Sequence, residues 1–484
     1  MRRYLRLALP GVLLATGAAG CADFLDAENA ARDPNEPSQA TRDQLFVAAQ
    51  VAMFGLQEAN VAQFSCVVIQ HCGGTGNYVE GYAQQYTQDA STFDPDFNQI
   101  YIGGGLVDLR TVQESAEEAG NLPYAGMAKV IEAINISFAA DNWGDIPYAA
   151  VRAGGDTPDF DQQLAVYDTL QLLLDDAIAD LGGAGTGPAA AFDLIYNGDK
   201  TKWIQAAYTL KARIHMHTAE VRGTSAYEAA IAAAQLGISA PENDLRALHN
   251  TATSERNLWY QFAFSTFGQY LKAGSGLVDI MEARGDRQRL AQYFSEIAPG
   301  DYAGYNVNLD GPELVSEVAT TPPSTRITDT FRQPILTWDE NQLIQAEAKF
   351  QTAGAAAAQP HLDAVRTRYG LAAAPATLQL IAEEQYVSYF QNIEAWQSYK
   401  RLCYPNLDPS DEASPVKIPA RLYYGETEGN ANPNTPSEAE QDAQGGVGSK
   451  ELGTVPTGST ATPRRNPNDP PGGTVNPGAA CIGQ

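Results

Sequence analysis

The sequence has few positively charged residues for its length. Its 484 residues include 31 Lys and Arg against 58 Asp and Glu, which gives a formal net charge of -27. Binding to nucleic acid or to anionic head groups needs a basic face, so this balance argues against both. An acidic surface suits a soluble chain that repels its own copies, and it leaves uncharged ligands such as sugars as candidates.

Signatures of common catalytic sites are also lacking. The sequence has no phosphate-binding loop, no His-Glu-x-x-His and no Ser-His-Asp pattern. The glycine-rich stretch 74–82 is too loose for a dinucleotide-binding loop, and Cys66, His71 and Cys72 do not have the spacing of a zinc site. We therefore expect no catalytic residue, no metal and no cofactor.

Hydrophobic runs are short. Residues 1–20 combine three arginines, a brief apolar segment and small residues, which is typical of a secretory signal peptide. Cys21 follows directly, as in a bacterial lipobox, although Ala18 stands where such sites usually have Leu. We expect cleavage before Cys21 and lipidation of its thiol, with an ordinary signal peptide as the alternative. No later run approaches the ~18 apolar residues of a spanning helix.

Cysteine is scarce in the rest of the chain, where four remain: Cys66, Cys72, Cys403 and Cys481. Export implies an oxidising compartment, in which an even number of cysteines suggests disulfides. Four cysteines allow three pairings, and the sequence alone does not choose among them. We predict Cys66–Cys72, which closes a short loop, and Cys403–Cys481, which would tie the C-terminal tail to the last helix.

Helical periodicity dominates what is present. Apolar residues recur at i, i+3 or i+4, and i+7, the mark of one buried face per helix. The predicted helices cover residues 41–58, 122–142, 163–181, 200–221, 225–236, 338–353, 358–369 and 376–400. Helices in pairs with short connections predict a mostly α protein, an α-solenoid of tetratricopeptide type, although no clean 34-residue repeat is present.

Composition divides the chain further. Residues 21–40 form an acidic tether and residues 41–434 the helical domain. Irregular insertions at 60–100 and 239–335 interrupt its helical pattern with glycines, prolines and aromatics, and residues 435–484 form a Pro/Gly-rich coil.

The stretch "FAADNWGDIPYAAV" (138–151) contains two carboxylates and an indole. A catalytic corner and a helix terminus are both conceivable interpretations. Gly144 suits the position just past a helix end, and Pro147 prevents the helix from continuing. The aspartates can accept hydrogen bonds from loop N–H groups. A structural helix end therefore explains every residue, and we favour it.

The same corner carries a resemblance to a known family. "DNWGDIPYAAV", followed by "FDQQLAVYDTLQLLLDDAIADL", resembles the SusD/RagB family of outer-membrane nutrient-binding lipoproteins. The further segments that resemble it, in order along the chain, are "KWIQAAYTLKARIHMH", "GLVDIMEARGDRQRLAQYF", "LTWDENQLIQAEAKF", "EAWQSYKRLCYP" and "IPARLYYGETEGNAN". The resemblance ends at about residue 434.

The resemblance implies four tetratricopeptide-like helix pairs and a loop-rich part that carries the ligand site. It implies a cell-surface lipoprotein of the outer membrane that captures an oligosaccharide, or another nutrient, for a SusC-like TonB-dependent transporter. An exported glycoside hydrolase and a structural solenoid adaptor that binds a protein are the alternatives.

Loop aromatics are the best candidates for a ligand site, because sugar rings stack their apolar faces on aromatic rings while amides bond the hydroxyls. Core packing is the competing explanation for each of them. The candidates are Trp259 and Tyr260, with Asn257 and Gln261 beside them, and Tyr78 and Tyr82 in the first insertion. Phe262 and Phe267 lie in the same stretch as Trp259.

Overall fold

The computed structural model describes residues 40–86, 88–151, 157–308, 316, 318, 326–402, 404–405, 407, 410, 418–419, 421–437 and 440–441. Cys21, Cys403, Cys481, the tether and most of the predicted C-terminal coil lie outside the described residues.

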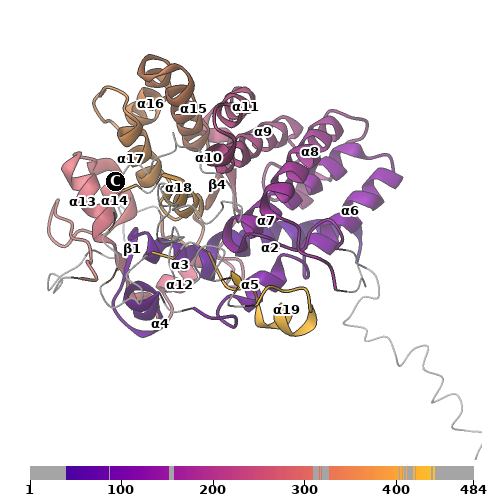
Figure 1. Cartoon of the computed structure of the whole chain (residues 1–484), viewed down its shortest axis with the longest axis horizontal. Coiled ribbons are helices and arrows are strands. Elements are labelled where there is room, and N and C mark those ends of the chain that lie inside the picture. Colours follow the sequence, from indigo (N-terminus) through magenta and orange to yellow (C-terminus); the bar gives the residue numbers. More distant parts are fainter. Residues whose placement is uncertain are drawn as a thin grey trace, which may run out of the picture.

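The described chain is mostly α-helical (Figure 1). The α-helices are α2 (Arg42–Glu58), α3 (Asn60–Val68), α4 (Asn77–Glu80), α5 (Asp94–Gln99), α6 (Leu106–Glu118), α7 (Leu122–Trp143), α8 (Gln163–Leu181), α9 (Lys200–His217), α10 (Ala219–Arg222), α11 (Thr224–Ala234), α12 (Leu258–Ala263), α13 (Ser275–Ala283), α14 (Arg287–Tyr293), α15 (Trp338–Ala353), α16 (Ala355–Arg368), α17 (Leu378–Ser388), α18 (Glu394–Leu402) and α19 (Glu426–Ala431). A π-helix, η1 (Gly81–Gln85), and the 3-10 helices η2 (Ala190–Phe192), η3 (Pro241–Asn243) and η4 (Gly268–Tyr270) are shorter.

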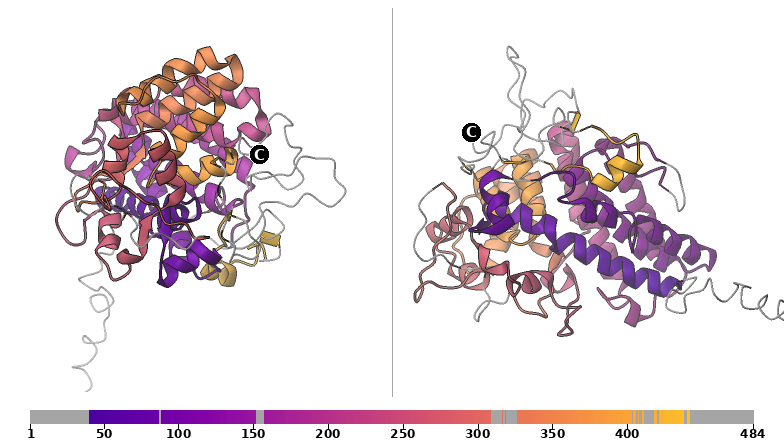
Figure 2. Two further views of the ribbon diagram at one scale, coloured as in Figure 1. Left: turned by 90° about the vertical axis from the view of Figure 1, so that its left-hand side faces the viewer. Right: turned by 90° about the horizontal axis from the view of Figure 1, so that it is seen from below.

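Successive long helices pack against one another, and this confirms the predicted solenoid of helix pairs. α2 packs on α6, and the contacts continue through α7, α8, α9 and α11 to α15 and α16. α7 lies in the middle of this row and is buried on nearly all sides, whereas α8 buries one stripe only. Figure 2 shows α2 running along the underside of the row.

Most predicted helices have the expected bounds. Thr41 starts α2 through a capping box, in which its hydroxyl accepts from Gln44 N and the Gln44 side chain accepts from Thr41 N. The prediction was wrong at 376–400, where α17 and α18 are separate helices, and α6 was not predicted. The insertion 60–100 is also more helical than expected, since it contains α3, α4, η1 and α5.

Residues Arg42–Val68 are, within the described ranges, long and apolar enough to cross a membrane by length and composition. The sequence pattern predicted no such stretch after the signal peptide. The segment consists of α2 and α3, which are separated at Ala59, and 61% of its apolar window is buried inside the fold. Core helices show this pattern.

The second insertion leaves the helical row after α11 and returns to it at α15. Strand β2 (Leu245–Arg246) pairs antiparallel with β4 (Pro334–Leu336) and so closes the two ends of the insertion on each other. Strand β1 (Cys72–Gly74) pairs antiparallel with β3 (Leu271–Ala273), which joins the first insertion to the second.

The corner after α7 is structural. Gly144 has φ +83° and ends the helix, and the Trp143 indole donates to Tyr423 O at 2.7 Å. The Asp145 carboxylate accepts from Gln163 N at 2.9 Å, which places the start of α8. The side chain of Asp141 points into the helical row, where the Tyr167 hydroxyl donates to it at 2.6 Å.

Asp141 belongs to a buried network of charges between α7, α9, α15 and α18. The imidazole of His217 lies between two carboxylates, with Nδ1 2.9 Å from Asp141 and Nε2 3.1 Å from Glu394. Arg213 contacts Glu340 and Glu394, and the ammonium of Lys400 donates to Asp141 O. Buried charges need such partners, because an unpaired one costs several kcal/mol.

His217 should make stability depend on pH. Its burial alone would lower the pKa, but Asp141 and Glu394 outweigh it and raise the pKa of His217 from 6.5 to about 9. The folded state therefore binds the proton more tightly, and this stabilisation, up to about 3 kcal/mol, is complete below pH 6.5 and lost as pH rises through 9.

The measurement is denaturant unfolding of the wild type and of His217→Gln from pH 6 to 10. The difference between the two proteins should shrink as pH rises. The comparison is needed because burial lowers the pKa of Lys400 to about 7, which contributes the opposite slope in both proteins. A difference independent of pH would contradict the assignment.

Candidate functional site

The two aromatic stretches predicted from the sequence meet in the structure. The pairing of β1 with β3 places the residues after Cys72 beside those after α12, and Thr75 N donates to Tyr270 O at 3.0 Å. Figure 1 shows α4, α12 and β1 together at one end of the molecule. The side chains that follow each strand therefore form one neighbourhood, although they are far apart in the sequence.

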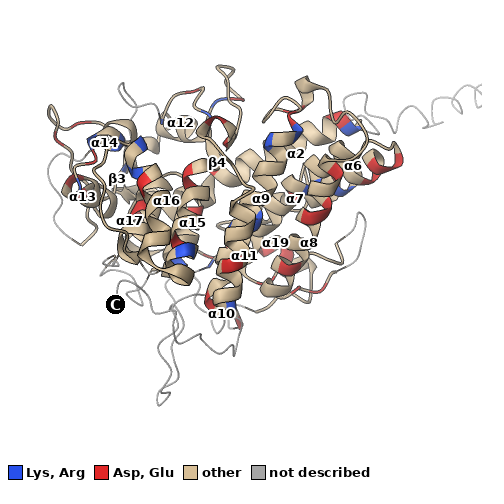
Figure 3. Cartoon of the chain, turned by 90° about the horizontal axis from the view of Figure 1, so that it is seen from above, with Lys and Arg blue, Asp and Glu red and all other residues tan. Residues whose placement is uncertain are grey.

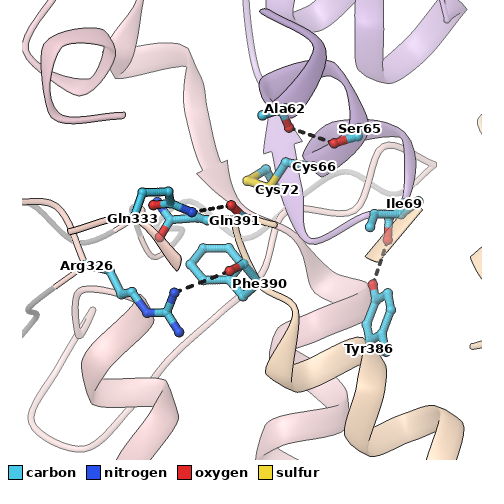
Figure 4. The surroundings of a disulfide bond; sticks show 10 residues. All are labelled: Ala62, Ser65, Cys66, Ile69, Cys72, Arg326, Gln333, Tyr386, Phe390 and Gln391. Atoms are coloured by element: carbon cyan, nitrogen blue, oxygen red, sulfur yellow. Dashed lines mark hydrogen bonds between the residues drawn. A yellow bond between two sulfur atoms is a disulfide. The ribbon is translucent and has the colours of Figure 1, made fainter. Parts of the chain in front are cut away.

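A disulfide fixes the first of these segments. Cys66 at the end of α3 is bonded to Cys72 at the start of β1, with their Cα atoms 5.2 Å apart, which confirms that predicted pair (Figure 4). The Tyr386 hydroxyl donates to Ile69 O at 2.6 Å inside the closed loop. The loop is thus attached both covalently and to α17.

Two exposed rings meet where α4 approaches the turn after α12. The rings of Tyr78 and Phe267 lie 5.3 Å apart, edge to face, and are 37% and 38% exposed. The ring centroid of Tyr82 lies 5.3 Å from that of Tyr78, edge to face, and Tyr82 also packs against Phe64 and Phe93 in the core.

A second pair lies one helical turn apart on α12 and its C-terminal end. Tyr260 and Phe264 have ring centroids 4.4 Å apart with an interplanar angle of 36°. Phe264 is 59% exposed and Tyr260 is half-buried. We call Tyr78, Tyr260, Phe264 and Phe267 the α12 aromatic group.

The turn that presents Phe267 is built from small residues. The Ser265 hydroxyl donates to Phe262 O at 2.6 Å and accepts from Phe267 N at 3.2 Å. A Cβ on Gly268 would lie 2.2 Å from Ala263 O, so only glycine allows the chain to turn this tightly. Gly76 similarly leaves room for the ring of Tyr270.

The phenols of Tyr78 and Tyr82 are neutral. Burial, with smaller contributions from Tyr78 and nearby aspartates, raises the pKa of Tyr82 to about 12, and burial raises the pKa of Tyr78. Both hydroxyls therefore keep their protons at neutral pH and can donate a hydrogen bond. Within the described ranges, no three His, Cys, Asp or Glu side chains gather as a metal site would require.

The structure corrects part of the predicted ligand set. Trp259 is 0% exposed and Asn257 is fully buried, so neither offers a surface to a ligand. Asn257 is the N-cap of α12, because its Oδ1 accepts from Tyr260 N at 2.9 Å. The side chain of Gln261 is half-buried and donates to Arg256 O at 2.7 Å.

Sequence reasoning missed Phe264, the most exposed aromatic of the group. Its spacing of four from Tyr260 is the available signal, since residues i and i+4 share a helix face. The sequence does not say which face of so short a helix is buried. The prediction of Trp259 and Tyr260 rests instead on their place in the irregular second insertion, beside Asn257 and Gln261.

Comparison with known proteins supports the fold and names the family. The family model described as "Starch-binding associating with outer membrane" matches residues 34–364. Two solved structures from Bacteroides thetaiotaomicron are similar. A SusD/RagB family protein has 19% identity over 83% of this chain and 96% of its own, with a TM-score of 0.64. A SusD-like protein has 19% identity over 85% and 98%, with a TM-score of 0.70.

A chitin-binding SusD homolog from Flavobacterium johnsoniae has 17% identity over 84% of this chain and 97% of its own, with a TM-score of 0.67. No curated protein sequence matches the chain. The fold thus defines a helical protein of the SusD type. The family model covers more than half of the sequence, and the chain belongs to the SusD-like family.

Proposed function

We propose that this protein binds a neutral glycan at the α12 aromatic group and does not act on it chemically. The observation that supports the proposal most is the exposure of the rings of Tyr78 and Phe267, which lie edge to face, and of Phe264, three residues before Phe267 in the chain. Exposed aromatic rings offer flat apolar faces, which suit the CH faces of sugars.

Charge supports a neutral ligand. The net charge of -27 opposes approach by acidic polysaccharides, and Figure 3 shows acidic residues on both halves of the molecule. The neutral phenols and the amides of Asn77 and Gln269, both exposed, can bond uncharged hydroxyls. The family description and the chitin-binding homolog give a starting panel of starch and chitin oligosaccharides.

Truncating the exposed rings should weaken binding. Phe264→Ala and Phe267→Ala should each reduce binding free energy by about 1–3 kcal/mol, which is roughly a five- to more than hundredfold loss of affinity, with little change in stability. Titration calorimetry with the glycan panel measures this. Phe192→Ala is the matched control, because Phe192 is an aromatic of similar exposure to Phe267 but lies on η2 against α2. Turnover of a glycan, or equal effects in all three variants, would contradict the proposal.

The proposal places the protein at the cell surface through a lipid on Cys21. Replacing Cys21 with Ser should release the protein from membrane fractions and abolish its acyl mass, because no thiol remains to be acylated. Fractionation and mass spectrometry of the mature chain test this. A Cys21→Ser variant that still carries acyl chains would show that the anchor is elsewhere.

The proposed partner is a SusC-like TonB-dependent transporter, to which the captured glycan would be delivered. Family membership supports this association. Purification of the tagged lipoprotein in mild detergent should recover a large β-barrel protein in equal amount, and recovery of the lipoprotein alone would argue against a stable complex.

A further inference from the structure

A buried carboxylate connects α2 to the helix that carries the proposed site. Glu58 is the last residue of α2 and is 0% exposed. Its Oε2 accepts from Leu258 N at 3.2 Å and from Asn257 Nδ2 at 3.3 Å. Both donors belong to the first turn of α12. The carboxylate therefore holds the start of this short helix.

Asn257 links Glu58 to the helix that carries the exposed rings. Its Oδ1 caps Tyr260 N, and its Nδ2 also donates to Phe331 O at 3.3 Å. Tyr260 and Phe264 lie on the same face of α12. A six-residue helix has too few internal hydrogen bonds to be stable alone, so its position depends on these contacts.

His249 shares a proton with Glu58. Nε2 of His249 lies 2.8 Å from Glu58 Oε1, and Nδ1 lies 3.3 Å from Glu255 O. A carbonyl oxygen accepts only, so Nδ1 carries a hydrogen. One further proton then lies between Nε2 and Oε1. If the pair loses this proton, the lone pairs of Nε2 and Oε1 face each other and repel. If the pair gains a second proton, two donors face each other and repel.

Few other charges act on this pair. Among the described residues, Glu58 accepts hydrogen bonds from two uncharged groups at the start of α12, the side-chain amide of Asn257 and the main-chain N–H of Leu258. Asn257 in turn contacts residues 329 and 331 through their main-chain oxygens, which carry no charge. The imidazole of His249 faces the carboxylate, and Glu255 faces His249 through its main-chain carbonyl. Burial raises the pKa of Glu58, although His249 acts against it, so protonation begins above the usual range of a glutamate.

We propose that Glu58 is a positioning residue for the α12 aromatic group and that its shared proton with His249 makes ligand affinity depend on pH. This inference rests on the proposed function for the affinity, whereas the positioning of α12 can be measured without a ligand. Affinity is highest where the pair holds one proton and falls in acid as Glu58 becomes protonated in addition.

Glu58→Gln is the decisive variant. An amide can keep its oxygen toward α12 while its NH2 group donates to a deprotonated Nε2 of His249, but a neutral amide oxygen is a weaker acceptor than a carboxylate. Affinity for the tightest glycan of the panel should fall about five- to tenfold, the loss expected when two hydrogen bonds to a buried group lose the assistance of its charge, and its dependence on pH should flatten because the amide takes up no proton. Amide exchange of residues 257–264 in the free protein should become faster.

Glu132→Gln is the matched control, because Glu132 is another buried carboxylate, bonded to Arg110, Gln113 and Tyr148 in the helical row. It should leave α12 exchange and affinity unchanged. Unchanged exchange of 257–264 in Glu58→Gln would overturn the positioning role whether or not glycans bind. Faster exchange with wild-type affinity would overturn the link to binding. Faster exchange in a protein whose wild type binds no glycan would refute the proposed function while leaving the positioning of α12 intact.

Discussion

Replacing Arg213 with alanine should lower the free energy of unfolding by about 3–5 kcal/mol. The guanidinium is 5% exposed, and its Nη2 donates to Glu340 Oε2 at 2.6 Å and to Ile335 O at 2.7 Å. Its Nε also lies 3.4 Å from Glu394. Without Arg213, the buried Glu340 carboxylate loses its cationic partner and Glu394 loses one of its partners while keeping His217. A buried charge without compensation is strongly destabilising.

Denaturant unfolding measures this loss, and Arg222→Ala is its control. Arg222 makes an equally bidentate pair with Asp168, at 2.7 and 2.9 Å, but both side chains are partly exposed to solvent. Exposed ion pairs contribute about 0–1 kcal/mol, so Arg222→Ala should be nearly neutral. Equal effects of the two substitutions would mean that the buried network does not hold α9 to α15.

Trp259→Ala should cost about 3–5 kcal/mol of stability, because removing a fully buried indole leaves a large cavity. The loss should concentrate in α12 and its surroundings. Phe264→Ala, five residues further on, should cost little stability because that ring is 59% exposed. The two variants thus separate packing from recognition within one short segment.

Thermal melts and glycan titration of both variants provide the test. The expected pattern is a destabilised protein for Trp259→Ala and a stable protein with weakened binding for Phe264→Ala. A stable Trp259→Ala protein that has lost binding would instead restore the original assignment of Trp259 as a ligand residue.

The helical row was predictable because helices such as α8 bury one apolar stripe. The apolar stripes of α8 and α9 and the capping residue of α2 depend only on neighbouring residues in the sequence. Such local patterns predict helices and their starts without knowledge of the tertiary structure. The end of α7 was predictable for the same reason, since Gly144 adopts a positive φ that other residues rarely tolerate.

The break between α17 and α18 was not predictable, because tertiary contacts make it. Gln391 has φ +60°, and its carbonyl oxygen accepts from the buried side chain of Gln333 (Figure 4). No glycine or proline marks this position. Helix propensity alone favours one continuous helix through this position. The contact with Gln333, in the loop of the second insertion, stabilises the break instead.

The site could be predicted as a set of segments but not as a surface. Both aromatic stretches were identified, yet Thr75 and Tyr270, which join them, are 195 residues apart. Within "WYQFAF" the residue types are alike, and exposure separates Trp259 from Phe264 only once α12 packs against α2. A lone sequence carries no information about that contact.

The central claim is that the α12 aromatic group binds a glycan, and a crystal structure of the complex tests it most directly. The account predicts a sugar ring stacked on at least one of Tyr78, Phe264 and Phe267, with the uncleaved oligosaccharide present. A bound oligosaccharide that contacts none of these rings, or a cleaved product elsewhere in the molecule, would contradict it.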